Sequence, residues 1–331
     1  MREYASRKTL RLHTPGHKGG LNALDITELT DDTFPAREIV GAEKRIAKIY
    51  GAKHAHLLCG GSSQGVKASI YFAGGDGIVD TNSHRSVFDG FKLAGKTCVT
   101  VGNRGMRPIT PNDIKRAIKP NIKTVVVTSP TYYGYTADIG GIRELCDRYG
   151  LTMIVDGAHG AHFGFSERLP KGFARIPDIC NVSAHKTLYA LTQSAIAFDN
   201  LSDDDSARYK EALALLGTTS PSYLLLSSIE DGVERVNSGD AAARYDKLYT
   251  AITELRSRYP FVDNDDFTRL VLDCAKYGGG EKVNAELSLR GVMSEMYDDR
   301  YVVFIVTAED GEDDIARLDR VLFEVAKSVK A

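Results

Sequence analysis

Short apolar runs alternate with helical patterns from about residue 52 to residue 200, and no other feature constrains the fold of this chain as strongly. Helical patterns such as 111–118 and 139–149 fall between most of the runs. Strands joined by helices pair in parallel, and the helices then cover both faces of the sheet. We therefore predict an α/β fold with a mostly parallel, seven-stranded sheet, whose strands span 55–58, 77–80, 97–101, 124–129, 152–156, 178–183 and 194–198.

The segments on either side of this region predict three structural units. Residues 1–35 are polar and contain Thr14-Pro15-Gly16-His17-Lys18-Gly19-Gly20, which is typical of a loop. Beyond the sheet, one long helix is expected over 224–258, and strands and helices alternate again after Tyr259-Pro260. We predict an N-terminal arm over 1–35, a major domain over 36–258 and a small C-terminal α/β domain over 259–331.

Composition limits the partners of the protein. The net charge of −2 argues against nucleic acid or an anionic membrane, because both select a basic surface. No apolar run approaches the length of a membrane span, and the first residues lack the apolar core of a signal peptide. The five cysteines are scattered without paired spacing, which indicates reduced thiols. We expect a cytoplasmic protein that acts on a small molecule.

Ligands of such sheets bind beyond the carboxyl ends of the strands, so the residues that follow each apolar run are the site candidates. Gly61-Ser62-Ser63 follows the first run and opens a helix, where backbone N–H groups and hydroxyls suit a phosphate. An ordinary helix-capping turn explains these residues as well. His84 follows the second run, and it is either a loop histidine or a site imidazole.

Asp156 and Lys186 follow two further runs. Asp156 lies at the mouth of the predicted core, where a carboxylate needs a cation or several hydrogen-bond donors. Lys186 follows a buried strand, so it is either a snorkelling surface residue or an amine placed for carbonyl chemistry. Asp156, His159 and His162 could in principle bind a metal, but no thiolate or known ligand spacing accompanies them, so we expect none.

One cofactor needs this combination of groups. Pyridoxal phosphate requires an amine for its aldehyde, a carboxylate for its ring nitrogen, a flat group over the ring and a cradle for its phosphate. Each member alone is weak evidence, whereas their order at successive strand ends is specific. The residues therefore predict pyridoxal 5'-phosphate as the cofactor.

Seven motifs, in order, resemble those of the bacterial ornithine/lysine/arginine decarboxylases. They are Thr14-Pro-Gly-His-Lys, Gly61-Ser-Ser, Asn82-Ser-His-Arg-Ser, Pro130-Thr-Tyr-Tyr-Gly, Asp156-Gly-Ala-His-Gly-Ala-His-Phe, Ser183-Ala-His-Lys-Thr-Leu and Thr218-Thr-Ser-Pro-Ser-Tyr. The resemblance implies the fold shared with aspartate aminotransferase, which is fold type I of the pyridoxal-phosphate enzymes. It also implies a homodimer with shared active sites.

The resemblance also implies roles for individual residues. Lys186 would form the Schiff base with the cofactor and later move protons at the substrate carbon, and Asp156 would pair with the ring nitrogen. His84 would stack on one ring face and Ala158 on the other, with His159 beside the ring. The phosphate would be held by Gly61, Ser62, Ser63, Ser183 and His185, together with Thr219 or Ser220 from the neighbouring subunit. The implied reaction is decarboxylation of ornithine, lysine or arginine to the corresponding amine.

The chain departs from the family pattern at Gly157, where family members usually have glutamate, and in its short C-terminal part. Glu295 resembles the family's acidic substrate-binding position, although a surface glutamate is the simpler interpretation. Two alternatives therefore remain. One is another fold type I enzyme, an aminotransferase or lyase, for which Arg300 could bind a substrate carboxylate. The other is a protein that binds the cofactor without decarboxylase turnover.

Overall fold

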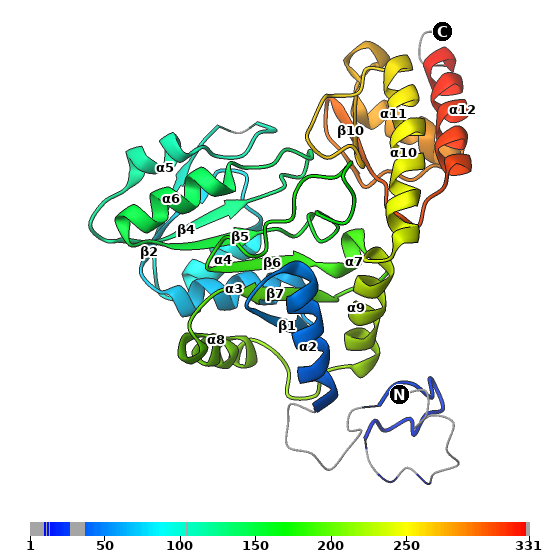
Figure 1. Ribbon diagram of the computed structural model, residues 1–331. Coiled ribbons are helices and arrows are strands. Elements are labelled where there is room, and N and C mark those ends of the chain that lie inside the picture. The colour runs from blue at the N-terminus through cyan, green and yellow to red at the C-terminus, as the bar shows by residue number, and fades with distance from the viewer. Residues whose placement is uncertain (1–9, 11, 13, 27–36, 104, 329–331) are drawn as a thin grey trace.

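The computed structural model describes residues 10, 12, 14–26, 37–103 and 105–328, and its central feature is a seven-stranded sheet (Figure 1). The strand order is β1-β7-β6-β5-β4-β2-β3. This confirms the predicted sheet, with boundaries that differ from the predicted ones by one or two residues. The strands are β1 (His54–Leu58), β2 (Asp76–Asp80), β3 (Cys98–Val101), β4 (Ile122–Thr128), β5 (Thr152–Asp156), β6 (Ile179–Ser183) and β7 (Ala195–Asp199).

Strand direction brings the polar strand ends to one edge of the sheet. The strands from β6 to β3 pair in parallel, whereas β7 is antiparallel to both β6 and β1. Two antiparallel pairings in succession leave β1 running in the same direction as β6. Leu58 and Ser183, the last residues of these two strands, therefore both pair with Ala195.

Helices cover both faces of the sheet, as the alternation predicts. Side chains on a strand alternate between faces, so Val125 and Val127 join one core cluster and Val126 joins the other. One cluster includes residues of α3 (Gly61–Ala73), α4 (Arg85–Leu93) and α8 (Asp203–Leu215). The other includes residues of α2 (Arg37–Tyr50), α5 (Pro111–Ala117), α6 (Ile139–Tyr149) and α9 (Tyr223–Val236).

The C-terminal part forms a three-stranded antiparallel sheet with its own helices (Figure 1). Its strands lie in the order β8 (Arg269–Asp273), β10 (Tyr301–Ile305) and β9 (Met296–Tyr297). Its helices are α11 (Gly280–Leu289) and α12 (Glu312–Ser328), and a 3-10 helix spans Ala275–Tyr277. Within the described residues, no helix has the length and apolar character that crossing a membrane requires.

The prediction of one helix over 224–258 is wrong, because two helices occupy this range. They are α9 and α10 (Gly239–Arg258). Ser238 breaks the helix: its backbone is extended, and its side chain accepts a hydrogen bond from the backbone N–H of Ala241. Helix α10 then packs against α12. The division at residue 259 remains a proposal, in which α10 connects the two domains.

Candidate active site

A cavity of about 390 Å³ lies at the edge of the sheet where the parallel strands end. Its lining includes every predicted site residue except Thr219 and Ser220. The predicted residues in the lining are Gly61, Ser62, Ser63, His84, Asp156, Ala158, His159, Ser183, His185 and Lys186. The fold thus brings together groups that are as far apart in the sequence as Gly61 and Lys186.

One end of the cavity has the features of an anion site. Helix α3 begins at Gly61, and no side chain caps its first N–H groups. Ser183 Oγ lies 2.8 Å from Ser62 Oγ, so two hydroxyls stand beside this helix terminus. His185 Nδ1 lies 2.9 Å from the carbonyl oxygen of Ser194 and must donate to it. The Nε2 atom of His185 is therefore left for a ligand.

His84 is held in place by the start of α4. It is the residue that caps this helix, and its Nδ1 accepts a 3.2 Å hydrogen bond from the backbone N–H of Ser86. The Ser86 hydroxyl lies 2.8 Å from the same nitrogen. The ring therefore has a fixed orientation at the cavity wall, as a group that stacks on a flat ligand requires.

Asp156 is a buried carboxylate that forms no ion pair with the described residues. It is 4% exposed, and it accepts a hydrogen bond from the backbone N–H of Ala158, at 3.2 Å. Burial raises the pKa of Asp156, although Lys186 and His84 oppose that shift. A protonated ring nitrogen would supply the missing partner, so this carboxylate fits pyridoxal phosphate.

Lys186 lies on the short helix α7 (Ala184–Thr187), directly after β6. Its Nζ atom is 3.1 Å from Nε2 of His159, and burial lowers its pKa below the ordinary lysine value. The side chain lines the cavity and does not snorkel to the surface. Of the two interpretations that the sequence left open, the geometry matches an amine placed for carbonyl chemistry.

Two further residues lie at or beside the site. Glu295 is exposed, as the surface interpretation predicts, and it also lines the cavity and accepts a 2.7 Å hydrogen bond from the hydroxyl of Tyr132. Arg269 is fully buried, and its Nη2 lies 3.2 Å from Nδ1 of His159. A charge directly before the apolar run Leu270-Val271-Leu272 was the available signal for Arg269.

Other candidates lie outside the cavity. Thr219 and Ser220 are exposed in the loop between α8 and α9. Arg300, considered for a substrate carboxylate, instead forms an ion pair of 2.6 Å with Asp273 on the surface of the small sheet. Within this chain, the cavity therefore contains neither the subunit-bridging hydroxyls nor this arginine.

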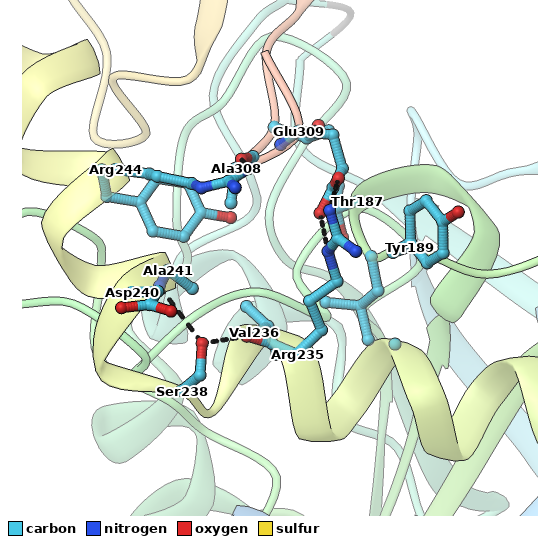
Figure 2. A pocket seen from close by; sticks show the side chains of 14 residues that line it. Thr187, Tyr189, Arg235, Val236, Ser238, Asp240, Ala241, Arg244, Ala308 and Glu309 are labelled. Atoms are coloured by element: carbon cyan, nitrogen blue, oxygen red, sulfur yellow. Dashed lines mark hydrogen bonds and ion pairs between the residues drawn. The ribbon is translucent and has the colours of Figure 1, made fainter. Parts of the chain in front are cut away.

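A second cavity, of about 220 Å³, is lined by Thr187, the residue after Lys186 (Figure 2). Arg235 pairs with Glu309 at its wall. The Thr187 hydroxyl is buried and has no hydrogen-bond partner among the described residues. The short helix that carries Lys186 thus contributes residues to two cavities.

A buried amine, a buried carboxylate, an oriented imidazole and an uncapped helix terminus meet at the carboxyl edge of a mostly parallel sheet. This combination defines the class of pyridoxal-phosphate enzymes of fold type I. A sequence model of the major domain of Orn/Lys/Arg decarboxylases matches residues 22–271. The chain belongs to the Orn/Lys/Arg decarboxylase family, and it is a pyridoxal-phosphate-dependent decarboxylase.

Individual relatives agree with this assignment. An arginine decarboxylase of Bacillus subtilis is 26% identical over 382 residues, which cover 99% of this chain and 76% of the relative. The solved structure of the Francisella novicida lysine decarboxylase superposes with a TM-score of 0.82 at 17% identity, covering 98% of this chain and 59% of that one. Serine palmitoyltransferase of Sphingomonas wittichii gives 0.72 at 16% identity, covering 92% and 80%. The two structures share the fold of this chain.

Proposed function

We propose that this protein decarboxylates a basic amino acid (ornithine, lysine or arginine) with Lys186 and Asp156 as the central catalytic residues. One observation carries the proposal: a single cavity contains the Lys186 amine, the uncompensated Asp156 carboxylate and, at its rim, the Glu295 carboxylate. The first two groups suit the cofactor, and the third suits a substrate with a distal positive charge. The cavity volume of about 390 Å³ lies within the usual range for small-molecule sites.

Each cofactor-facing residue has a defined task in this proposal. The phosphate would lie against the start of α3, with Ser62, Ser63, Ser183 and His185 as partners. Asp156 would keep the ring nitrogen protonated, and His84 and Ala158 would enclose the ring faces. Lys186 Nζ would bind the aldehyde carbon. These assignments rest on the cavity lining and on the chemistry of the groups.

The reaction breaks the bond between Cα and the carboxylate. When bound, pyridoxal phosphate supplies the electron sink for the electron pair that remains on Cα. Carbon dioxide leaves, and Lys186 would move a proton to Cα, so that the product is an amine. Glu295, oriented by Tyr132, would bind the distal ammonium or guanidinium group of the substrate.

We also propose a homodimer in which Thr219 or Ser220 reaches the phosphate of the partner's site. The exposed 217–220 loop supports this, because its hydroxyls lie outside the cavity of their own chain. A groove of about 810 Å³ between α2 and α9, lined by Leu24, Leu191 and Leu224 among others, offers an apolar surface for the second copy. The free thiols of all five cysteines support a reducing, cytoplasmic location.

The main proposal is tested by measuring the release of carbon dioxide from ornithine, lysine and arginine separately, with purified protein and added cofactor. We expect turnover on at least one of the three and none with Lys186→Ala. Amino-group transfer to a keto acid, measured in parallel, tests the alternative of an aminotransferase. Cofactor binding without turnover on any amino acid would overturn the decarboxylase proposal and favour the binding-protein alternative.

A further inference from the structure

Two hydrogen bonds connect Lys186 to an arginine of the small C-terminal sheet. His159 lies between them: its Nε2 is 3.1 Å from Lys186 Nζ in a partly buried contact, and its Nδ1 is 3.2 Å from Arg269 Nη2 in a buried one. His159 is 7% exposed and Arg269 is 0% exposed, so the contact between these two side chains is shielded from water. Each ring nitrogen of His159 therefore has one defined partner.

The donor and acceptor capacities of the three side chains determine where the protons are. A guanidinium group has only donors, so Nδ1 of His159 must accept from Arg269 and carries no proton. A neutral imidazole has a single N–H, which must then be on Nε2. Lys186 can accept this hydrogen bond only through a lone pair, and only the neutral amine has one. The geometry is therefore that of an unprotonated Lys186.

We propose that Arg269 is a positioning residue that fixes the tautomer of His159, and that the Nε2–H of His159 in turn holds Lys186 as a neutral, reactive amine. This proposal rests on the proposed function in one respect: it takes Lys186 as the residue that captures the cofactor. Arg269 can act on Lys186 only in the folded protein, because Arg269 begins β8, which follows β6 by almost ninety residues.

Arg269 is itself held in a fixed position. Its backbone N–H donates to the carbonyl of Asp266, and its own carbonyl accepts from Asn264 Nδ2 at 2.8 Å. Gly134, with φ of +85°, leaves room for it, since a Cβ there would lie 2.8 Å from Arg269 Cβ. The glycine of the Pro130-Thr-Tyr-Tyr-Gly motif thus makes space for this arginine.

The surrounding charges agree with the proposed protonation states. The groups that face His159 are Arg269 on β8, Lys186 on α7, His162 on its own loop and His84 before α4, and the ring edge of Tyr132 packs on it. Burial and these positive groups lower the pKa of His159 well below its usual value. Burial, with a contribution from Arg269, also lowers the pKa of Lys186, while the carboxylates of Asp156 and Glu295 act in the opposite direction. Both shifts favour the neutral forms that the hydrogen-bond geometry requires.

The proposal can be tested by measuring how fast the cofactor-free protein captures pyridoxal phosphate as a function of pH. The visible absorbance of the bound cofactor reports this rate. Arg269→Met removes the cation and keeps an unbranched side chain, whereas Arg269→Lys keeps a cation that only donates. Arg256→Met is the matched control. This partly buried arginine donates to the carbonyls of Val262 and Arg269, whereas it forms no hydrogen bond with His159 among the described residues.

We expect the capture rate of Arg269→Met to have its pH midpoint raised by about one unit, because one neighbouring cation has been removed. At pH values below the wild-type midpoint this corresponds to about tenfold slower capture, which recovers at higher pH. Arg269→Lys and Arg256→Met should keep the wild-type midpoint. An unchanged midpoint in folded Arg269→Met, or an equal shift in Arg256→Met, would overturn the proposal.

Nitrogen NMR of the cofactor-free protein, labelled at histidine, separates this inference from the proposed function. The His159 signal, identified with His159→Gln, should report a neutral ring protonated at Nε2 between about pH 6 and 8, where an ordinary histidine titrates. In Arg269→Met the ring should titrate or change tautomer. A ring that titrates normally in the wild type contradicts the inference even if the enzyme is active. Absence of cofactor capture by the wild type contradicts only the proposed function.

Discussion

The hydroxyl of Tyr132 donates a 2.7 Å hydrogen bond to Oε1 of Glu295, and this bond joins the end of β4 to the segment before β9 across the cavity. The two residues are 163 positions apart in the chain. The major sheet thus supplies the cofactor-facing groups, and the small sheet supplies an acidic group at the rim. The opening of the proposed substrate site depends on the packing of one sheet against the other.

This pair predicts a substrate-binding defect. Glu295→Gln should raise KM for the basic amino acid about 10- to 100-fold with a smaller effect on kcat, because a charge-assisted hydrogen bond is worth about 1.5–3 kcal/mol. Tyr132→Phe should raise KM less, since the carboxylate remains. Steady-state carbon dioxide release measures both, with the exposed Glu312→Gln as the control. Equal KM values for wild type and Glu295→Gln would remove Glu295 from the substrate site.

Lys186→Ala should abolish covalent capture of the cofactor and reduce turnover by at least about 1,000-fold, because no other lysine lines the cavity in the part of the chain that the structure describes. Mass spectrometry after borohydride reduction measures the covalent adduct. Lys210→Ala, which alters a lysine near the surface of α8, is the control and should retain the adduct. An adduct of normal yield in Lys186→Ala would show that another lysine holds the cofactor.

Asp156→Asn should separate stability from catalysis. Burial raises the pKa of Asp156 in the folded state, so the carboxyl group ionises at lower pH in the unfolded chain than in the folded one. Asp156 therefore destabilises the cofactor-free fold as the pH rises above the ordinary aspartate pKa. The amide removes that penalty, so the cofactor-free variant should be more stable at neutral pH by about 1 kcal/mol, while turnover falls about 100-fold or more. Urea unfolding at neutral and acidic pH, with exposed Asp263→Asn as control, tests the sign. A less stable variant would indicate that the carboxylate is compensated within the apo-protein.

Asp266→Asn should destabilise the protein strongly. Asp266 is fully buried, and although burial opposes ionisation, the positive charges of His162 and Arg269 lower its pKa. Because its folded-state pKa is lowered, ionised Asp266 stabilises the fold at pH values above the ordinary aspartate pKa. This stability is lost as the pH falls through the folded-state pKa. The amide leaves buried cations without their counter-charge, so we expect a loss of about 3–5 kcal/mol near neutral pH. Urea titrations at several pH values measure it, and a loss that does not shrink toward acidic pH would contradict the assignment.

The proposed shared active site predicts complementation between two inactive variants. Subunits with Lys186→Ala lack the amine, and subunits with Ser220→Glu, a change at an exposed loop residue, would repel the partner's phosphate. Refolding the two variants together should restore part of the activity, because a mixed dimer contains one site with neither change. Each variant refolded alone is the control. Failure of the mixture to recover activity, despite mixed dimers detected by native mass spectrometry, would refute sharing.

The sequence by itself determined the fold class and most of the residues proposed for the cofactor site. The alternation of apolar runs and helical patterns is local, and the carboxyl ends of the strands that point in one direction must meet at one edge. Gly61, His84, Asp156 and Lys186 could therefore be grouped before their positions were known. Local capping chemistry was less visible, which is why the break at Ser238 inside a helical pattern was missed.

Only the tertiary structure decided what Glu295 and Arg269 contact. Nothing local to either residue indicates its partner, because burial and hydrogen bonding depend on how the small sheet packs against the major one. Pairing of strands within the small sheet removed Arg300 from consideration, because it brings Arg300 to Asp273. A strand-end pattern can specify which groups line the candidate site, whereas contacts between distant segments determine the proposed protonation of Lys186 and the rim of the proposed substrate site.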